Sequence, residues 1–117
     1  IIVPPNARQV LEPFARHPDP AFVIANPPYL LPGTLEATPE VAIHEPAQAL
    51  FAPEGDPLFF YAGIAIQARA FRSKLFRVFL EIPHERAEKI AGLFRAQDWE
   101  TRLEHDLHGR NRVLIAL

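Results

Sequence analysis

The sequence predicts an α/β fold with a mostly parallel sheet that closes in an antiparallel hairpin. After residue 20, strand-like and helix-like segments alternate along the chain, and this alternation is typical of parallel strands joined by crossover helices. A short turn at Gly109 precedes the last strand-like segment, so that strand must run antiparallel to its neighbour. The length of 117 residues suffices for one compact domain with a single core.

The first strand and the loop after it are marked by prolines. Ala21–Ala25 is an apolar run between Pro20 and Asn26-Pro27, and it is predicted to be a strand buried on both faces. From Pro28 to Pro57 the prolines recur too often for a long helix, so a structured loop is predicted there.

Two helices are predicted from capping signals and apolar spacing. Asp56-Pro57 has the form of a helix start, with an acidic N-cap and proline at the first helical position. This helix should run to about Arg72, with an inward stripe of Leu58, Tyr61, Ala65 and Ala68. The second should run from about His84 to Gln97, with an apolar face of Ala87, Ile90, Ala91 and Phe94.

Three more strands complete the predicted sheet. Residues 75–82 form a buried strand that Pro83 ends, and residues 112–117 form a last, nearly all-apolar strand after a turn at 108–111. Between them the chain alternates strictly. One predicted face holds Trp99, Thr101, Leu103, His105 and Leu107; the other holds Glu100, Arg102, Glu104 and Asp106.

Composition excludes several kinds of site. The chain has no cysteine, which rules out disulfides, thiolate zinc sites and cysteine nucleophiles. No apolar run approaches the roughly 18 residues of a membrane span, and residues 1–5 lack the basic and apolar regions of a signal peptide. A net charge of -2 offers no general attraction for nucleic acid, although a local basic patch stays compatible with it.

Asn26-Pro27-Pro28-Tyr29 is the motif that carries chemistry. It directly follows the first strand, and ligands of open α/β sheets bind beyond the carboxyl ends of strands. The Asn26 side-chain oxygen and the Pro27 carbonyl can accept the two hydrogens of a planar amide, which favours positive charge growing on its nitrogen. The prolines restrict the backbone, and Tyr29 offers a flat packing face. A plain turn after a strand is the alternative interpretation.

The chain resembles the HemK-type protein-(glutamine-N5) methyltransferases, in the carboxyl-terminal part of their catalytic domain. Residues 21–31 are similar to the family signature, an apolar strand leading into Asn-Pro-Pro-Tyr. Further similar segments are Pro39-Glu40-Val41, Glu45-Pro46, Ala49-Leu50, Asp56-Pro57-Leu58, Phe60-Tyr61, Leu80-Glu81-Ile82 and residues 106–113. The resemblance implies the second half of a class I S-adenosylmethionine-dependent (Rossmann-like) sheet, with residues 1–20 a poorly matched lead-in and 21–117 a partial catalytic domain.

The resemblance also implies a reaction. It is methyl transfer from S-adenosyl-L-methionine to the N5 amide nitrogen of the glutamine in the Gly-Gly-Gln loop of class-1 peptide chain release factors, in the cytoplasm. Asn26 and Pro27 would be catalytic, Asn26 to Tyr29 would bind the substrate, and Asn26 would also contact the cofactor. Alternatives are a ribosomal-protein glutamine methyltransferase, an N6-adenine or N2-guanine nucleic-acid methyltransferase, and an inactive truncated module.

The chain departs from the family pattern at several positions. His44 stands where tyrosine is common, Pro83 where glycine is common and Arg86 where glutamine is frequent. No two of the five glycines are close enough for the family's cofactor loop. We therefore expect no methyl transfer by these 117 residues alone.

Each of three other groups of polar residues can be interpreted as functional or as merely structural. His105 and His108 lie on opposite faces of a strand and match no zinc pattern, so no metal is expected. His44-Glu45 is either a loop anchor or a substrate contact. The basic residues Arg69, Arg72, Lys74 and Arg77 are either a solvated helix end or a docking surface for release factor or ribosomal RNA.

Overall fold

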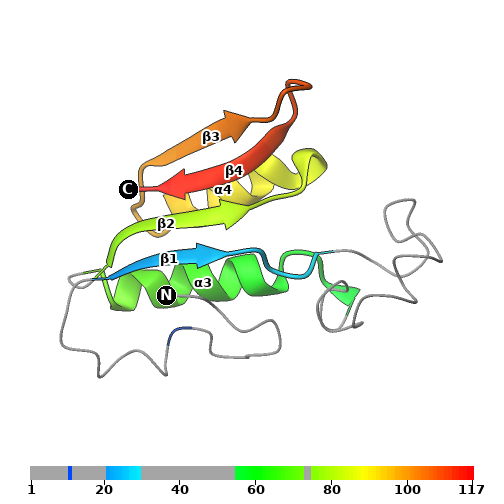
Figure 1. The fold of residues 1–117 in the computed structure, drawn as a ribbon. Coiled ribbons are helices and arrows are strands. Elements are labelled where there is room, and N and C mark those ends of the chain that lie inside the picture. Colours follow the sequence, from blue (N-terminus) through cyan, green and yellow to red (C-terminus); the bar gives the residue numbers. More distant parts are fainter. Residues whose placement is uncertain (1–10, 12–20, 30–54, 73–74) are drawn as a thin grey trace.

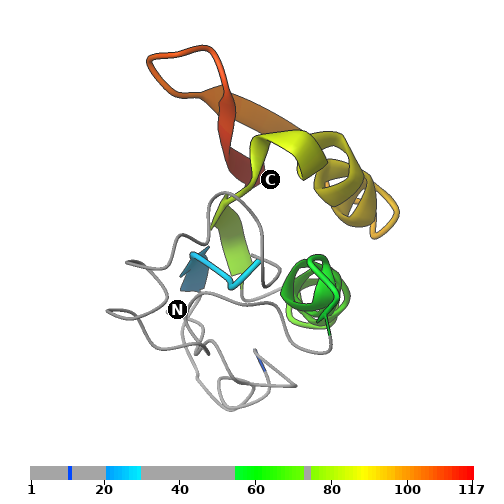
Figure 2. The same cartoon turned by 90° about the vertical axis from the view of Figure 1, so that its right-hand side faces the viewer.

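A computed structural model of the chain describes residues 11, 21–29, 55–72 and 75–117. These residues form a mixed sheet with two α-helices on one of its faces (Figures 1 and 2). The elements are β1 (Ala21–Ala25), α3 (Phe59–Ala70), β2 (Leu75–Glu81), the 3-10 turn η3 (His84–Arg86), α4 (Ala87–Arg95), β3 (Thr101–His105) and β4 (Asn111–Ala116). The predicted order of strands and helices is confirmed.

The sheet has the strand order β1-β2-β4-β3. β1 pairs with β2 in parallel, whereas β4 is antiparallel to both β2 and β3. β1, β2 and β3 therefore run in one direction, and β4 alone among the described strands is reversed. This confirms the prediction of a mostly parallel sheet with a terminal antiparallel hairpin. It also brings the carboxyl ends of β1, β2 and β3 to the same edge of the sheet (Figure 1).

The core lies between the sheet and its two helices. Val23 is opposite Val78, and Leu80 is opposite Leu114; all four side chains are fully buried against the helices. The helix α4 buries Ala87, Ile90, Ala91 and Phe94, which is the face predicted from their spacing. Of the predicted stripe on α3, Tyr61, Ala65 and Ala68 are buried and Leu58 packs at the edge of the core.

The opposite face of the sheet is more open than the sequence predicts. Phe22 and Ile24 of β1 are 48% and 51% exposed, although both faces of this strand were expected to be buried. That expectation is wrong for the outer face of β1, because α3 and α4 both pack on the other face (Figure 2). Phe22 and Phe79 meet edge to face there, with ring centroids 6.4 Å apart.

The helix α3 begins later than its capping signal predicts. The Asp56 carboxylate accepts the backbone N–H of Leu58 at 2.9 Å, and the Asp56 carbonyl accepts the N–H of Phe59 at 3.1 Å. Asp56 and Pro57 therefore form a turn ahead of the helix, and Leu58 stands at the N-cap without a side-chain cap. The Asp56-Pro57 pattern therefore marks a turn ahead of the helix, but the prediction that Asp56 is the N-cap residue is wrong.

The alternation predicted for residues 99–107 holds only as far as Glu104. Thr101 and Leu103 are partly buried while Arg102 and Glu104 are exposed. A register shift between Glu104 and His105 then disrupts the pairing with β4. Leu107 lies in the turn and is fully exposed, so the prediction that it shares a strand face with Thr101 and Leu103 is wrong.

Two of the clustered arginines serve the carboxyl end of α3. Arg69 forms an ion pair with Asp98 at 3.1 Å, and Arg72 donates to the Asp98 carbonyl at 2.8 Å. The Arg72 guanidinium also lies 4.9 Å from the centroid of the Trp99 ring. These contacts favour the structural interpretation of both residues, in which they tie the end of α3 to the turn before β3.

Candidate functional site

The four residues after β1 separate into an exposed amide and a buried anchor. Asn26 is exposed at the carboxyl end of the strand, whereas Pro27 and Pro28 are buried and Tyr29 is partly buried against the core. Proline restricts its own backbone and that of the preceding residue. The Asn26 carboxamide is therefore presented at the edge of the sheet by a stiff, packed segment.

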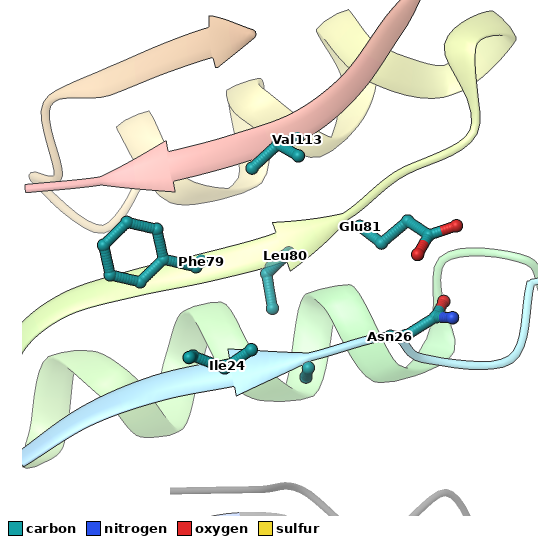
Figure 3. Close-up of a pocket in the computed structure, with 7 residues that line it drawn as sticks. Ile24, Asn26, Phe79, Leu80, Glu81 and Val113 are labelled. Carbon is teal, nitrogen blue, oxygen red and sulfur yellow. The ribbon is translucent and has the colours of Figure 1, made fainter. Parts of the chain in front are cut away.

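A pocket of about 510 Å³ opens beside Asn26 on the sheet face away from the helices (Figure 3). Its apolar wall comes from β1, β2 and β4. Its lining residues are Ile24, Ala25, Asn26, Phe79, Leu80, Glu81 and Val113. The two polar side chains, Asn26 and Glu81, stand at the same end of this wall, where β1 and β2 finish (Figure 3). An apolar wall with a few polar groups at one end is typical of a small-ligand site.

Glu81 is the pocket residue that the sequence interpretation missed. In the sequence, Glu81 is notable only as part of the Leu80-Glu81-Ile82 segment that resembles the family. It is the last residue of β2 and pairs with Val113 of β4, so its side chain shares the open face with Phe79 and Val113. The only signal in the sequence is an acid at the end of a largely apolar strand; that this strand lies next to β1, which Asn26 follows, is known only from the strand order.

Tyr61 of α3 supports this end of the sheet from the core. Its side chain is fully buried, and its hydroxyl donates to the Glu81 carbonyl at 2.7 Å. Burial raises the pKa of the Tyr61 hydroxyl far above its usual range, with smaller contributions from Tyr29 and the Glu81 charge. Tyr61 is therefore a neutral donor at every ordinary pH, and it fixes the backbone at the end of β2.

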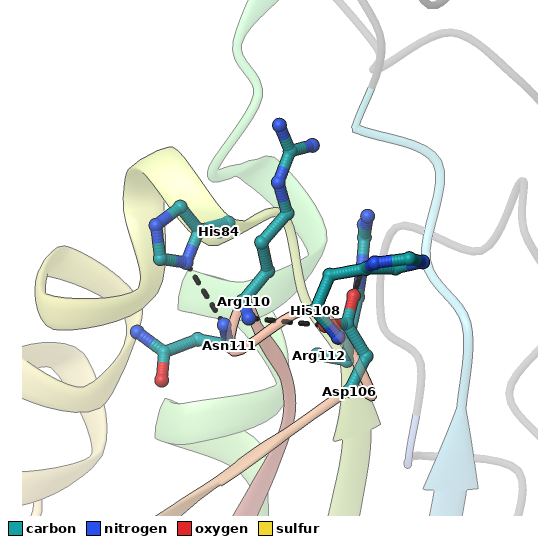
Figure 4. A network of polar contacts seen from close by, with 6 residues as sticks. All are labelled: His84, Asp106, His108, Arg110, Asn111 and Arg112. Atoms are coloured by element: carbon teal, nitrogen blue, oxygen red, sulfur yellow. Dashed lines mark hydrogen bonds and ion pairs between the residues drawn. The ribbon is translucent and has the colours of Figure 1, made fainter.

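The β3–β4 turn at the same edge is organised by one carboxylate (Figure 4). Asp106 accepts the backbone N–H groups of His108 at 2.8 Å and Arg110 at 3.0 Å, and the Arg112 guanidinium at 2.9 Å. Gly109 completes the turn with φ +75°, a conformation that glycine adopts without strain. The Asn111 N–H donates to His84 Nδ1 at 2.8 Å, which ties the turn to η3.

These contacts also shift two pKa values. The hydrogen bond to Asp106 is the main reason that the pKa of Arg112 is raised, and Tyr29 and Glu81 contribute less. The Arg112 hydrogen bond, followed by the Arg110 backbone contact, lowers the pKa of Asp106 from 3.8 to about 2. Arg112 thus stays charged, close enough to Glu81 and Tyr29 for its field to reach both.

The depressed pKa of Asp106 predicts how stability depends on pH. Because the folded-state pKa lies below the unfolded one, the Asp106 contacts stabilise the fold above about pH 4 and lose this contribution between about pH 4 and pH 2. Asp106→Asn is expected to lower the melting temperature at neutral pH and to have a much smaller effect at about pH 2. Asp98→Asn, which removes an exposed ion pair, is the control and should change the melting temperature little. A deficit in Asp106→Asn that persists undiminished at about pH 2 would contradict this assignment.

The structure places only some of the residues predicted to be functional. Asn26 lines the pocket; of the next three residues, Pro27 and Pro28 are buried and Tyr29 packs against the core. His44 and Glu45 lie outside the described residues, and Arg86 is partly buried in η3. No group of three or more metal-ligating side chains occurs in the described part of the chain. Within the same part, no helix has the length and apolar character needed to cross a bilayer.

Comparison with known proteins identifies methyltransferases as relatives. No protein-family model matches the chain. The bifunctional methyltransferase of Rickettsia bellii (strain RML369-C) is 33% identical over 98 residues, which is 80% of this chain and 17% of the relative. The release factor glutamine methyltransferase of Streptococcus pneumoniae is 32% identical over 100 residues, 80% of this chain and 34% of the relative. The enzyme of the same name in Bacteroides thetaiotaomicron is 29% identical over 97 residues, 81% of this chain and 35% of the relative.

The chain therefore spans between about a sixth and about a third of the length of these relatives. The matches cover most of its own length, and its mixed sheet with a parallel pair and an antiparallel hairpin agrees with a class I methyltransferase fold. Over about 80% of its length the chain is thus homologous to the HemK-type methyltransferases, in the carboxyl-terminal part of their catalytic domain.

Proposed function

We propose that the protein containing this chain transfers a methyl group from S-adenosyl-L-methionine to the N5 amide nitrogen of a protein glutamine. The observation that carries this proposal is the placement of Asn26. Its exposed carboxamide borders a pocket at the carboxyl end of β1, on a segment anchored by two buried prolines. The names of two relatives, which describe release factor glutamine methyltransferases, support the same substrate class.

The chemistry of an amide explains why such a site is needed. The lone pair of an amide nitrogen is delocalised into the carbonyl, so the nitrogen is a poor nucleophile. Two acceptors, the Asn26 side-chain oxygen and the Pro27 carbonyl, would hold the two amide hydrogens and aim the lone pair at the methyl group. Both acceptors favour the positive charge that grows on nitrogen during transfer. Tyr29 would pack against the planar amide.

The fit of the cofactor to the described residues is partial. S-adenosyl-L-methionine supplies a methyl group made electrophilic by its sulfonium. Asn26 is the described residue that fits a contact with it, because its polar side chain is exposed at the strand end beside the pocket. No described glycine directly follows a strand in a G-x-G pattern, so the described residues include no loop of the kind that cradles a nucleotide cofactor.

We further propose class-1 peptide chain release factors as the substrate, with the cytoplasm as the place of reaction. The methyl-accepting glutamine would be the one in their Gly-Gly-Gln loop. A ribosomal-protein glutamine is the alternative within the same chemistry, and an exocyclic amine of adenine or guanine is the alternative in nucleic acid. The net charge of -2 on this chain favours a protein substrate over a phosphate backbone.

Incorporation of a labelled methyl group tests this choice. The protein containing this chain would be incubated with labelled S-adenosyl-L-methionine and, separately, with release factor, ribosomal proteins and duplex DNA. The expected result is label in release factor alone, abolished when its Gly-Gly-Gln glutamine is replaced by alanine. Label in ribosomal protein or DNA and none in release factor would overturn the proposed substrate.

A further inference from the structure

The carboxylate of Glu81 lies beside Asn26, and the reaction as proposed above gives it no role. Both side chains line the pocket, and both lie where their strands end (Figure 3). Glu81 is exposed and takes part in none of the ion pairs found among the described residues. A carboxylate at the polar end of an otherwise apolar pocket is available to a ligand bound there.

The backbone that carries Glu81 is fixed on both sides. The Glu81 carbonyl accepts the buried Tyr61 hydroxyl at 2.7 Å, and the N–H of the next residue, Ile82, donates to the Arg112 carbonyl at 2.9 Å. The pairing of Glu81 with Val113 sets the face on which the side chain emerges. The Glu81 side chain can therefore rotate about its own bonds, but the backbone from which it extends into the pocket is held in place.

The reaction proposed above creates a charge that Asn26 cannot neutralise. As the nitrogen lone pair forms the new N–C bond, the C–S bond breaks and its electron pair goes to sulfur. The nitrogen is left with a positive charge and two hydrogens, one of which must leave as a proton. Asn26 is neutral, and its side-chain oxygen can accept a hydrogen bond but is far too weak a base to take up the proton, whereas a carboxylate can accept the proton itself.

We propose that Glu81 stabilises the growing positive charge on the substrate nitrogen and accepts the proton that leaves it. This inference rests on the proposed function and adds a catalytic residue to it. Arg112 carries a positive charge whose field reaches Glu81. Asp106 holds the Arg112 side chain at 2.9 Å, so the hairpin turn contributes to this site through Arg112.

Glu81→Gln keeps the size of the side chain and removes its charge and basicity. In the protein containing this chain, this variant is expected to lower kcat for glutamine methylation by about 10²-fold, with little change in KM. Glu81→Asp should recover part of the lost rate because it restores a carboxylate. The matched control is Glu85→Gln, which removes an exposed carboxylate on η3 that does not line the pocket. Melting temperatures of all three variants should equal that of the wild type.

The possible results separate this inference from the proposed function. If the wild type methylates glutamine and Glu81→Gln has the same kcat, the role of Glu81 is overturned while the function stands. If Glu81→Gln instead weakens the binding of S-adenosyl-L-methionine in calorimetry and leaves kcat unchanged, Glu81 is a cofactor ligand and the inference is equally overturned. If the wild type methylates no glutamine, the function and the role of Glu81 both fall.

Discussion

Replacing Asn26 with alanine is expected to lower kcat for methyl transfer by about 10²- to 10³-fold, the usual cost of losing one group that stabilises charge in a transition state. The Asn26 side chain is exposed and lines the pocket, so its removal should leave the fold intact. The loss should come from misplacement of the substrate amide, because one of its two hydrogens would have no acceptor. Steady-state kinetics with release factor as the substrate would measure it.

The control for Asn26 is the same change at the start of β4. Asn111→Ala removes an identical carboxamide from a residue that does not line the pocket and whose backbone N–H still donates to His84. This variant should keep the wild-type kcat, and both variants should melt at the wild-type temperature. An Asn26→Ala protein that retains a third or more of the wild-type kcat would contradict a catalytic role for Asn26.

The largest expected effect on stability comes from α4. Phe94 is fully buried between α4 and the sheet, and Phe94→Ala is expected to lower the free energy of unfolding by about 3–5 kcal/mol. The cost combines the lost burial of the ring with the cavity that it leaves. Denaturant titration would measure this loss of unfolding free energy. The transition to follow is the one in which this sheet unfolds.

Ile66 provides the comparison for Phe94. It lies on α3 with 61% of its surface exposed, so Ile66→Ala should change the free energy of unfolding by about 0.5 kcal/mol or less. A loss of less than about 1 kcal/mol in Phe94→Ala would mean that α4 does not pack as described.

The sequence was most informative where one local pattern determines the structure. The spacing of Ala87, Ile90, Ala91 and Phe94 identified the buried face of α4 because a helix brings those positions onto one side. The turn at Gly109 required an antiparallel last strand, and β4 pairs in that direction with both of its neighbours. Neither inference depends on which other elements are nearby.

The sequence was least informative where the outcome depends on distant packing. The apolar side chains of Phe22 and Ile24 suggest burial, but their exposure is decided by the helices, which both lie on the other face. Asp56-Pro57 has the residues of an N-cap, yet the same hydrogen-bonding groups serve equally well in a turn.

The residues of the candidate site also differ in whether the sequence alone could identify them. Asn26 could be found from its motif because all four residues are consecutive. Glu81, Tyr61 and Arg112 could not, because they come from a strand, a helix and a second strand and meet only through the strand order β1-β2-β4. A site assembled across strands is visible only once their order and register are known.

The position of the transferred methyl group tests the central claim most directly. Release factor treated with S-adenosyl-L-methionine and the protein containing this chain would be digested and fragmented in a mass spectrometer. The expected result is one added methyl group on the side-chain amide nitrogen of the Gly-Gly-Gln glutamine, with a yield about 10²- to 10³-fold lower at the same short reaction time when Asn26→Ala replaces the wild type. A methyl group on any other atom, or an equal yield from Asn26→Ala, would contradict the claim that Asn26 and the loop behind it bind a glutamine amide for methylation.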